Sequence, residues 1–325
     1  MSGGLLVRAE YRKGKLNDAP LPQTQPPSVE ANHSERRCFS TTDWTGKNEI
    51  MRSFLLSAIA IVLTLVGSAS GDTPKSLRLR VLTYNIHHAE GVDRKLDLER
   101  IGRVINDVRP DVVALQEVDQ GVERTDRVDQ PAVLSRLTKM HVVFGDNIQF
   151  GGGKYGNVIL SRFPISRSRN HRLPNRDKGE QRGALEASID VPDWPQPLVF
   201  FATHLDHRKD DRERHESAQA INSLAAKRAE HPTLLAGDLN DTADSRTLRE
   251  FARSWTQAND KPLSTVPVKE PSRQIDFILF RSMNCWKSIE VKVLPESVAS
   301  DHRAMLAVLE LRPAESGSVL EPSRR

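Results

Sequence analysis

Residues 77–85 read LRLRVLTYN, and this pattern predicts a β-strand whose far end is buried. Apolar residues alternate with arginines at the start of the run, as in a strand with one solvated face. Apolar residues at 98, 101, 104, 105 and 108 follow with the spacing of one helix face, and Pro110 ends that helix. Residues 111–116 then predict a second, apolar strand. This order of strand, helix and strand indicates an α/β chain.

The rest of the chain continues to alternate strand and helix signals without a repeat. A short helix is predicted over 129–137, and longer helices over 210–229 and 245–254. Because strands outnumber helices, we expect two mixed β-sheets packed face to face with helices outside, around a core of about 250 residues. The further strands are predicted at 141–147, 157–161, 183–189, 198–203, 234–236, 275–280, 289–294 and 304–311.

The start of the chain carries a different signal. Residues 1–50 are rich in Pro, Gln, Ser and Asn without an apolar period, which predicts a disordered or artefactual upstream extension. Met51 and Arg52 precede an apolar run over 54–67 and small residues, the pattern of a signal peptide over 51–71. We expect translation to begin at Met51 and residues 72–325 to be secreted or periplasmic, with 313–325 a disordered tail. A membrane anchor through 54–67 and a buried core helix are the alternatives.

Composition excludes several classes of protein. The 325 residues are 28% charged and 38% hydrophobic, which excludes disorder throughout and a polytopic membrane protein. Two cysteines, Cys38 and Cys285, exclude a disulfide scaffold and a cysteine-rich zinc site. The net charge of +4 is only weak support for nucleic-acid binding.

Polar residues that can carry chemistry share one position, the end of an apolar strand. Strand ends and their loops place reacting groups on a rigid base. Asp276 is the hardest to explain structurally, because an acid between Ile275 and Phe277 is costly unless partnered. We assign structural roles to the remaining histidines. The strand-end candidates are Asn85, Glu117, His204, Asp238, Asn240, Asp276, Asp301 and His302, and the histidines set aside are His87, His88, His207 and His215.

These residue types suit one chemistry. Carboxylate and amide oxygens are the ligands that Mg²⁺ and Mn²⁺ prefer, and Glu117 is the strongest candidate ligand. A second carboxylate can activate water, while histidine and asparagine can stabilise the charge that grows on a phosphate. The pattern therefore predicts metal-assisted hydrolysis of a phosphoester.

Seven short motifs, in order, resemble the endonuclease/exonuclease/phosphatase superfamily, which includes abasic-site endonucleases, DNase I, neutral sphingomyelinases and inositol polyphosphate 5-phosphatases. The resemblance implies a DNase I-like four-layer α/β sandwich and a Mg²⁺- or Mn²⁺-dependent hydrolase of ester bonds. The motifs are TYN at 83–85, LQEV at 115–118, GNVILS at 156–161, THL at 203–205, GDLN at 237–240, QID at 274–276 and SDH at 300–302.

The resemblance also implies a role for each matched residue. Glu117 would bind the metal with Asn85 beside it, and Asp301 would lie near the metal or its water. Where some nucleases of the superfamily carry a further acidic ligand, this chain has His87, which puts a second metal in doubt. The remaining implied roles are water activation by Asp238, phosphate binding by Asn240 and His204, charge stabilisation or leaving-group assistance by His302 held by Asp276, and substrate contacts by Asn157 and Arg182.

The substrate is open at this stage. We expect a secreted phosphodiesterase or phosphatase of non-nucleic substrates, because the motifs look most like secreted bacterial members of the superfamily. Those members also resemble a fungal domain involved in glycolipid-anchor remodelling, so a lipid head group is a candidate. A secreted nuclease and a non-catalytic relic that binds polyanions or membranes are the alternatives. A basic run over 167–182 is either a solvated face or an attraction for anions. We expect a monomer without a protein partner.

Overall fold

The protein is described by a computed structural model that covers residues 76–281 and 285–313. The predicted extension 1–50, the predicted signal peptide 51–71 and, apart from Pro313, the predicted tail 313–325 lie outside the described residues. The described residues all belong to one unit of the chain, Ser70–Arg325. Within them, no helix has both the length and the apolar character needed to cross a bilayer.

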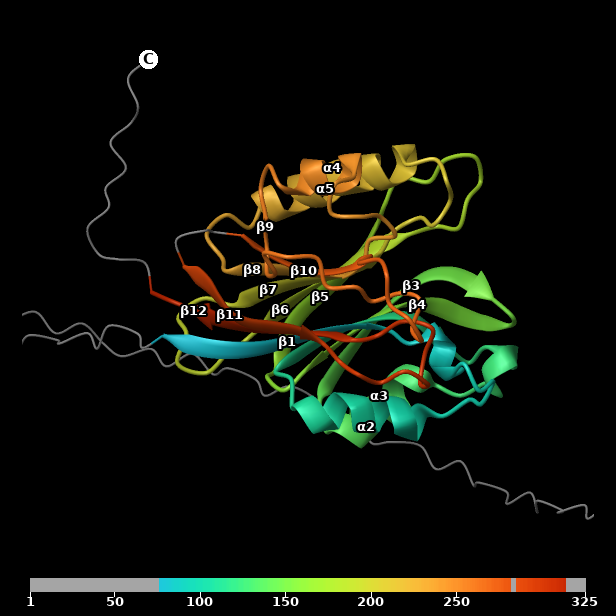
Figure 1. The fold of residues 1–325 in the computed structure, drawn as a ribbon. Helices are drawn as coiled ribbons and strands as arrows, with labels where there is room; N and C mark the ends of the chain where they lie inside the picture. Colours follow the sequence, from blue (N-terminus) through green and yellow to red (C-terminus); the bar gives the residue numbers. More distant parts are fainter. Residues whose placement is uncertain (1–75, 282–284, 314–325) are drawn as a thin grey trace, which may run out of the picture. The chain divides into compact units, whose positions relative to one another are not determined.

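Two six-stranded sheets form the middle of the fold (Figure 1). Strands β1 and β2 pair in parallel, as do β7 and β8, and the other pairings are antiparallel, so both sheets are mixed. The first sheet runs β11 (Trp286–Val293), β12 (Met305–Leu311), β1 (Leu77–Asn85), β2 (Val112–Gln120), β4 (Gly153–Ser161), β3 (His141–Phe150). The second runs β5 (Ile165–Arg172), β6 (Gly183–Ile189), β7 (Leu198–His204), β8 (Thr233–Asp238), β10 (Asp276–Arg281), β9 (Thr256–Gln257).

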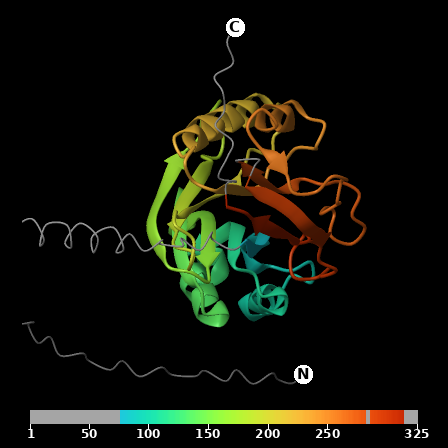
Figure 2. The ribbon, with the colours of Figure 1, turned by 90° about the vertical axis from the view of Figure 1, so that its left-hand side faces the viewer.

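Helices cover the outer faces of both sheets, as Figures 1 and 2 show from two directions. Helices α2 (Leu98–Val108) and α3 (Gln130–Thr138) lie on the first sheet, and α4 (Arg212–Ala226) and α5 (Arg246–Phe251) lie on the second. Asp97 and Asp129 cap α2 and α3 by accepting hydrogen bonds from backbone N–H groups of the first turn, at 2.7 and 3.0 Å. The four-layer α/β sandwich expected from the sequence is therefore confirmed.

Burial on both faces explains why the central strands carry consecutive apolar residues, as in Leu198–Ala202 of β7. Phe200 belongs to the cluster between the two sheets, whereas its neighbour Phe201 packs under α4 and α5. Val112 and Val113 divide in the same way on the first sheet. Because successive strand residues point to opposite faces, a strand covered on both sides needs apolar residues at every position.

Two strands are absent from the sequence-based prediction. Strand β5 has the sequence ISRSRNHR and lies at the edge of the second sheet, with most of its side chains at least partly exposed. Such an edge strand carries polar and basic residues on both faces and so lacks the apolar alternation that marks a strand. Strand β9 has two residues. The helix expected over 245–254 is shorter, ending at Phe251, and β3 and β4 extend further into their hairpin than expected.

Candidate active site

Three neighbouring strands of the second sheet place three polar residues in a row. His204 ends β7 and lies opposite Asp238, which ends β8, in the parallel register. Asp276 begins β10 and lies opposite Asp238 from the other side. The strands approach closely here: a Cβ added at Gly237 would lie 1.9 Å from the carbonyl oxygen of Thr203. The sheet itself thus brings two carboxylates and an imidazole side by side.

His302 completes this group from the loop before β12. Its Nδ1 lies 2.9 Å from Asp276 Oδ2, and its Nε2 lies 3.7 Å from Asp238 Oδ2. Ser300 holds the loop, because its hydroxyl donates to the Asn85 carbonyl oxygen at 2.7 Å and accepts from the His302 backbone N–H at 3.1 Å. Asp238 and Asp276 are 1% exposed and His302 is 8% exposed. The group is therefore shielded from water on most sides.

The first sheet contributes Asn85 and Glu117 to the same place. Asn85 ends β1, and its Nδ2 donates to Glu117 Oε1 at 3.0 Å and to Asp238 Oδ2 at 3.1 Å. Glu117 lies where the register of β2 with β4 shifts between Leu115 and Val118, and its φ is +60°. A bulge of this kind redirects a side chain out of the normal alternation. Asn85 therefore links the two sheets directly through polar groups.

His204 is held between an arginine and an asparagine. Arg182, 2% exposed, donates from Nη1 to His204 Nδ1 at 3.1 Å and from Nη2 to His207 Nδ1 at 3.2 Å. An imidazole that accepts at Nδ1 carries its proton on Nε2, which lies 3.5 Å from Asp238 Oδ2. Asn240 Nδ2 lies 3.0 Å from the same Nε2, but both atoms are donors in this tautomer, so Asn240 Nδ2 donates instead to the Leu205 carbonyl oxygen at 3.1 Å.

Burial and neighbouring charges separate the protonation states of these groups. Burial, followed by the facing Asp276 carboxylate, raises the pKa of Asp238 to about 7. Burial alone would lower the pKa of His302, but the carboxylates of Asp276 and Asp238 overcome it and raise that pKa to about 10. Burial and the Arg182 charge hold the pKa of His204 well below its usual range. Near neutral pH the site thus contains a cationic His302, a neutral His204 and a carboxyl group ready to exchange a proton.

Two groups of side chains in the described residues have the spacing to hold a metal ion. One is Asp238, Asp276 and His302, which are buried. The other is Glu117 with His87 and His88, in the 3₁₀ turn His87–Ala89 that follows β1. In each group the potential ligand atoms lie within 4.8 Å of one another. Of the three predicted metal ligands, Glu117, Asn85 and Asp301, Glu117 is the one that belongs to such a group among the described residues.

The remaining predicted residues lie around this centre. Asp301 is exposed, and its Oδ1 accepts from Ser300 Oγ at 3.3 Å. Asn157 is buried on β4, where its Nδ2 donates to the Gly183 carbonyl oxygen at 3.1 Å and its Oδ1 has no partner within the described part of the chain. Asn85 offers its amide nitrogen, not its oxygen, to Glu117. The ligand roles of Asn85 and Asp301 and the substrate roles of Asn157 and Arg182 stay predictions.

Sequence reasoning set aside three histidines that the structure brings to the site. His207 binds Arg182, and His87 and His88 lie beside Glu117. The only available signal was the pair of consecutive histidines directly after the first strand-end asparagine, in NIHH at 85–88. The contact with Glu117 spans about thirty residues and has no local pattern.

The basic run over 167–182 does not form one surface. Arg172 and Arg176 have carboxylate partners: Arg172 Nη2 lies 3.8 Å from Asp146 Oδ2, and Arg176 Nε lies 2.7 Å from Glu216 Oε2. Arg182 is buried in the site already described. Arg172 and Arg176 are therefore in surface ion pairs and Arg182 is in the interior, whereas Arg167, Arg169 and Lys178 are exposed.

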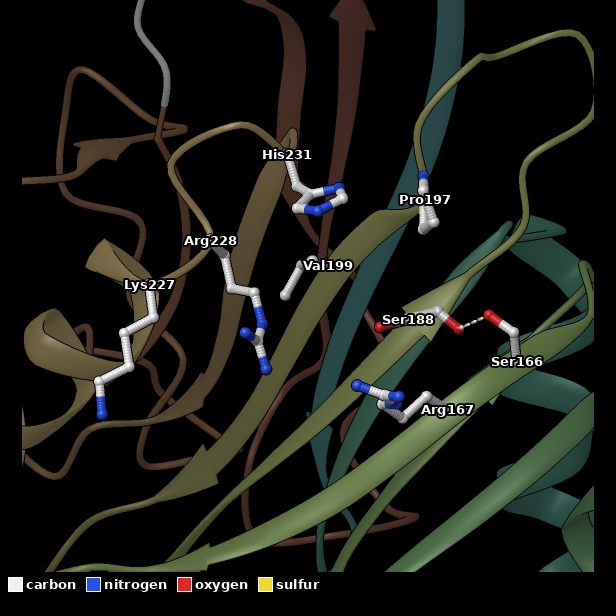
Figure 3. A pocket seen from close by; sticks show the side chains of 8 residues that line it. All are labelled: Ser166, Arg167, Ser188, Pro197, Val199, Lys227, Arg228 and His231. Atoms are coloured by element: carbon white, nitrogen blue, oxygen red, sulfur yellow. Dashed lines mark hydrogen bonds between the residues drawn. The ribbon is translucent and has the colours of Figure 1, made fainter.

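Arg167, from the same run, lines a pocket at the other end of the second sheet (Figure 3). Val199, near the start of β7, also lines this pocket and pairs with Thr233 at the start of β8. His204 and Asp238 end those two strands. The pocket is thus separate from the candidate active site. Its other lining residues are Ser166, Ser188, Pro197, Lys227, Arg228 and His231.

The fold and this set of residues define a class of protein, and residues 82–302 match the model of the Endonuclease/Exonuclease/phosphatase family. The chain belongs to that family. It is similar to the uncharacterised protein YbhP of Escherichia coli K12, with 26% identity over 74% of this chain and 99% of that protein. A family structure from Beutenbergia cavernae matches with a TM-score of 0.62 and 27% identity, covering 73% of this chain and 72% of that one. A mannosyl-6-phosphatase from Bacteroides thetaiotaomicron shares the fold with a TM-score of 0.59 and 17% identity, over 71% of this chain and 99% of that one.

Proposed function

We propose that the protein is a metal-dependent phosphoesterase that hydrolyses a phosphodiester or phosphomonoester, with Asp238 as the base that activates water. The supporting observation is the buried row of His204, Asp238 and Asp276, closed by His302. A carboxyl group whose pKa is about 7 takes up and releases a proton at neutral pH, as a general base must. Structural ion pairs also perturb pKa values. Asp238, however, lies at the end of a strand in a chain that belongs to a family of phosphoesterases.

The neighbouring groups fit the charge changes of this reaction. In the proposed step, Asp238 Oδ2 takes a proton from water as the water oxygen bonds to phosphorus and the ester oxygen leaves. The cationic His302 then faces the negative charge on the phosphate or protonates the leaving oxygen. The neutral His204 and the Asn240 amide are donors for the phosphate oxygens. Preorganised donors of this kind stabilise charge without rearranging when the charge forms.

We propose that Glu117 binds the divalent metal ion of the family, Mg²⁺ or Mn²⁺. The residues present fit such an ion, because one Glu117 oxygen accepts from Asn85 and the other has no hydrogen-bond partner among the described residues. The ion would neutralise charge on the bound phosphate. The protein's own part is to hold Glu117 in the bulge of β2, next to Asp238.

We propose a small or lipid-linked phosphoester as the substrate, outside the cytoplasm, and a monomeric enzyme. The division of the basic run supports this choice over a nuclease. An enzyme that grips a nucleic-acid backbone needs arginines and lysines free to contact successive phosphates. Here Arg172 and Arg176 are paired with acids and Arg182 is buried, which leaves Arg167, Arg169 and Lys178 exposed, and Arg167 lines the pocket away from the site. A lipid head group and a sugar phosphate remain within the proposed class.

The test is a side-by-side assay of the purified full-length chain. The substrates are a chromogenic phosphodiester, a mannose 6-phosphate monoester, sphingomyelin and plasmid DNA, each with EDTA, Mg²⁺, Mn²⁺ or Ca²⁺. We expect metal-dependent turnover of at least one of the first three, lost in His302→Ala. His141→Ala is the matched control, because His141 is exposed at the opposite end of the strands. Cleavage of plasmid DNA alone would assign a nuclease, and no turnover of any substrate would contradict the proposal.

A further inference from the structure

We propose that His87, His88 and Glu117 bind a divalent ion of the later first-row transition metals, such as Co²⁺ or Zn²⁺, in preference to Mg²⁺. One ring nitrogen of each histidine and a carboxylate oxygen of Glu117 lie within 4.8 Å of one another. This inference deepens the proposed function by naming the class of metal, but the binding itself does not depend on catalysis.

Hydrogen bonds from the two rings leave one lone pair free on each. His87 Nδ1 lies 3.0 Å from the backbone oxygen of Glu90, and a carbonyl oxygen only accepts, so the proton is on Nδ1 and the lone pair on Nε2. His88 Nε2 lies 3.3 Å from the Glu90 carboxylate, so donation there leaves the lone pair on Nδ1. Histidines that bind metals typically donate their other ring N–H to a carboxylate or carbonyl oxygen.

The His88 Nδ1 lone pair is a buried acceptor. The His88 side chain is 8% exposed, and its Nδ1 has no hydrogen-bond partner among the residues that the structure describes. Leaving such an atom unpaired is costly, and native structures rarely do so without a reason. A metal ion bound at Nδ1 would satisfy this atom, and Glu117, which has a carboxylate oxygen within 4.8 Å of a His88 ring nitrogen, would supply the negative charge that the ion requires.

The backbone holds both histidines in an unfavourable conformation. His87, His88 and Glu117 have φ values of 45°, 44° and 60°, in the left-handed region that residues with a Cβ avoid. Gln130 fixes the turn by donating from Nε2 to the His88 carbonyl oxygen at 2.7 Å. Such strain persists where the surrounding structure requires it, and it concentrates at functional sites.

The guanidinium of Arg124 does not compete with a metal ion for the Glu117 carboxylate. Arg124, which lies close enough to affect His88 electrostatically, is engaged by both oxygens of Asp119, at 2.8 and 2.9 Å. Asn85 presents an amide nitrogen to Glu117, and that group cannot bind a metal. A ring nitrogen of each histidine thus lies within 4.8 Å of a Glu117 carboxylate oxygen.

The donor set decides the class of ion. Mg²⁺ binds oxygen ligands and water, whereas imidazole nitrogen suits the later first-row metals. Two histidines and a glutamate are a known donor set for Zn²⁺ that leaves a position open for water or substrate. An acid at position 87 would have made the site favour Mg²⁺. The two histidines shift the preference of the site toward the later first-row metals.

The test measures binding directly. The full-length chain is stripped with EDTA and titrated with Co²⁺, whose visible absorption reports nitrogen ligands, followed by displacement with Zn²⁺ and with Mg²⁺. We expect one Co²⁺ per chain, displaced by Zn²⁺ and not by millimolar Mg²⁺. His87→Ala and His88→Ala should each weaken Co²⁺ binding by at least about tenfold, and the half-exposed Glu90→Ala by about 10–100-fold. Glu90→Ala keeps the test usable if loss of buried His88 unfolds the chain.

Two controls separate the possible outcomes. His141→Ala should leave the Co²⁺ spectrum unchanged. A spectrum that survives His87→Ala and His88→Ala but disappears in His302→Gln would place the ion at the Asp238 group and overturn the inference. Equal displacement by Mg²⁺ would also overturn it. Histidine-dependent binding without turnover would leave this inference standing and reject the proposed function, whereas Mg²⁺-supported turnover unaffected by His87→Ala would do the reverse.

Discussion

The Asp276 carboxylate lies next to one acid, Asp238, and one base, His302. It faces Asp238 across the strand pair and hydrogen-bonds His302 at 2.9 Å. A carboxylate that faces another acid makes that acid harder to ionise. A carboxylate next to an imidazole stabilises the protonated, cationic form of the imidazole. Burial is the larger cause of the raised pKa of Asp238 and Asp276 adds to it, whereas at His302 the Asp276 and Asp238 carboxylates together overcome burial, so Asp276 favours the protonated form of both groups.

Replacing Asp276 by Asn should move the alkaline limb of the pH–rate profile to lower pH. The carboxylate charges keep His302 protonated up to about pH 10, against the effect of burial. Without the Asp276 charge, burial lowers the pKa of His302. The active, protonated form is thus lost at a lower pH, and we expect kcat to fall by about 10²–10⁴-fold at neutral pH. The measurement is kcat/KM against pH at saturating metal ion. A large loss of metal affinity, measured by calorimetry, would instead make Asp276 a ligand.

At the scale of the element, the bulge in β2 aims Glu117. Regular pairing with β4 would send this side chain to a fixed face of the sheet, and the shift between Leu115 and Val118 redirects it toward Asn85. The φ of +60° is the conformational cost of that redirection.

Glu117→Gly and Glu117→Ala should both lose activity but differ in stability. Loss of the metal ligand should lower kcat/KM by at least about 100-fold in both variants. Glycine adopts positive φ without strain, so the Gly variant should unfold with a free energy about 1 kcal/mol higher than the Ala variant. Urea denaturation of both variants measures this difference. Half of the activity remaining at saturating metal in either one would show that Glu117 does not bind the ion.

The approach of β7 to β8 makes a second prediction at this scale. A Cβ at Gly237 would lie 1.9 Å from the Thr203 carbonyl oxygen, which is backbone and cannot swing away. Gly237→Ala should therefore destabilise the protein by about 1–3 kcal/mol or more and separate His204 from Asp238. Thermal unfolding followed by circular dichroism checks the stability. Gly121→Ala is the comparison, because no atom lies within 4 Å of a Cβ there, although its φ of +71° adds strain. Equal melting temperatures for the two variants would contradict the expected clash.

At the scale of the whole molecule, charge decides between classes of substrate. The chain has a net charge of +4, and of the basic run Arg172 and Arg176 are paired and Arg182 is buried. We therefore expect kcat/KM on a small phosphodiester to change less than about tenfold between about 50 and 200 mM salt. A protein that contacts six to ten phosphates loses about 10³–10⁵ in affinity over the same range. A loss of that size with the proposed substrate would indicate an extended polyanion site.

The layers and strand ends of this protein can be predicted from its sequence alone. Runs such as 81–84 and 112–115 are largely apolar because both faces of a central strand are covered, and each is followed by a polar residue. The exposed strand β5 was not predicted for the complementary reason, since an edge strand with polar faces has no such contrast.

The two sheets, the outer helices and the strand-end polar residues were thus determined by the sequence, because burial leaves a local pattern of apolar residues. Only the tertiary structure brought Asn85 to Asp238, set Asp276 opposite Asp238 and placed His87 and His88 beside Glu117. These contacts join residues far apart in the chain. The pKa of Asp238 and the donor set around Glu117 depend on which groups meet in space and how deeply they are buried, and no local pattern encodes either.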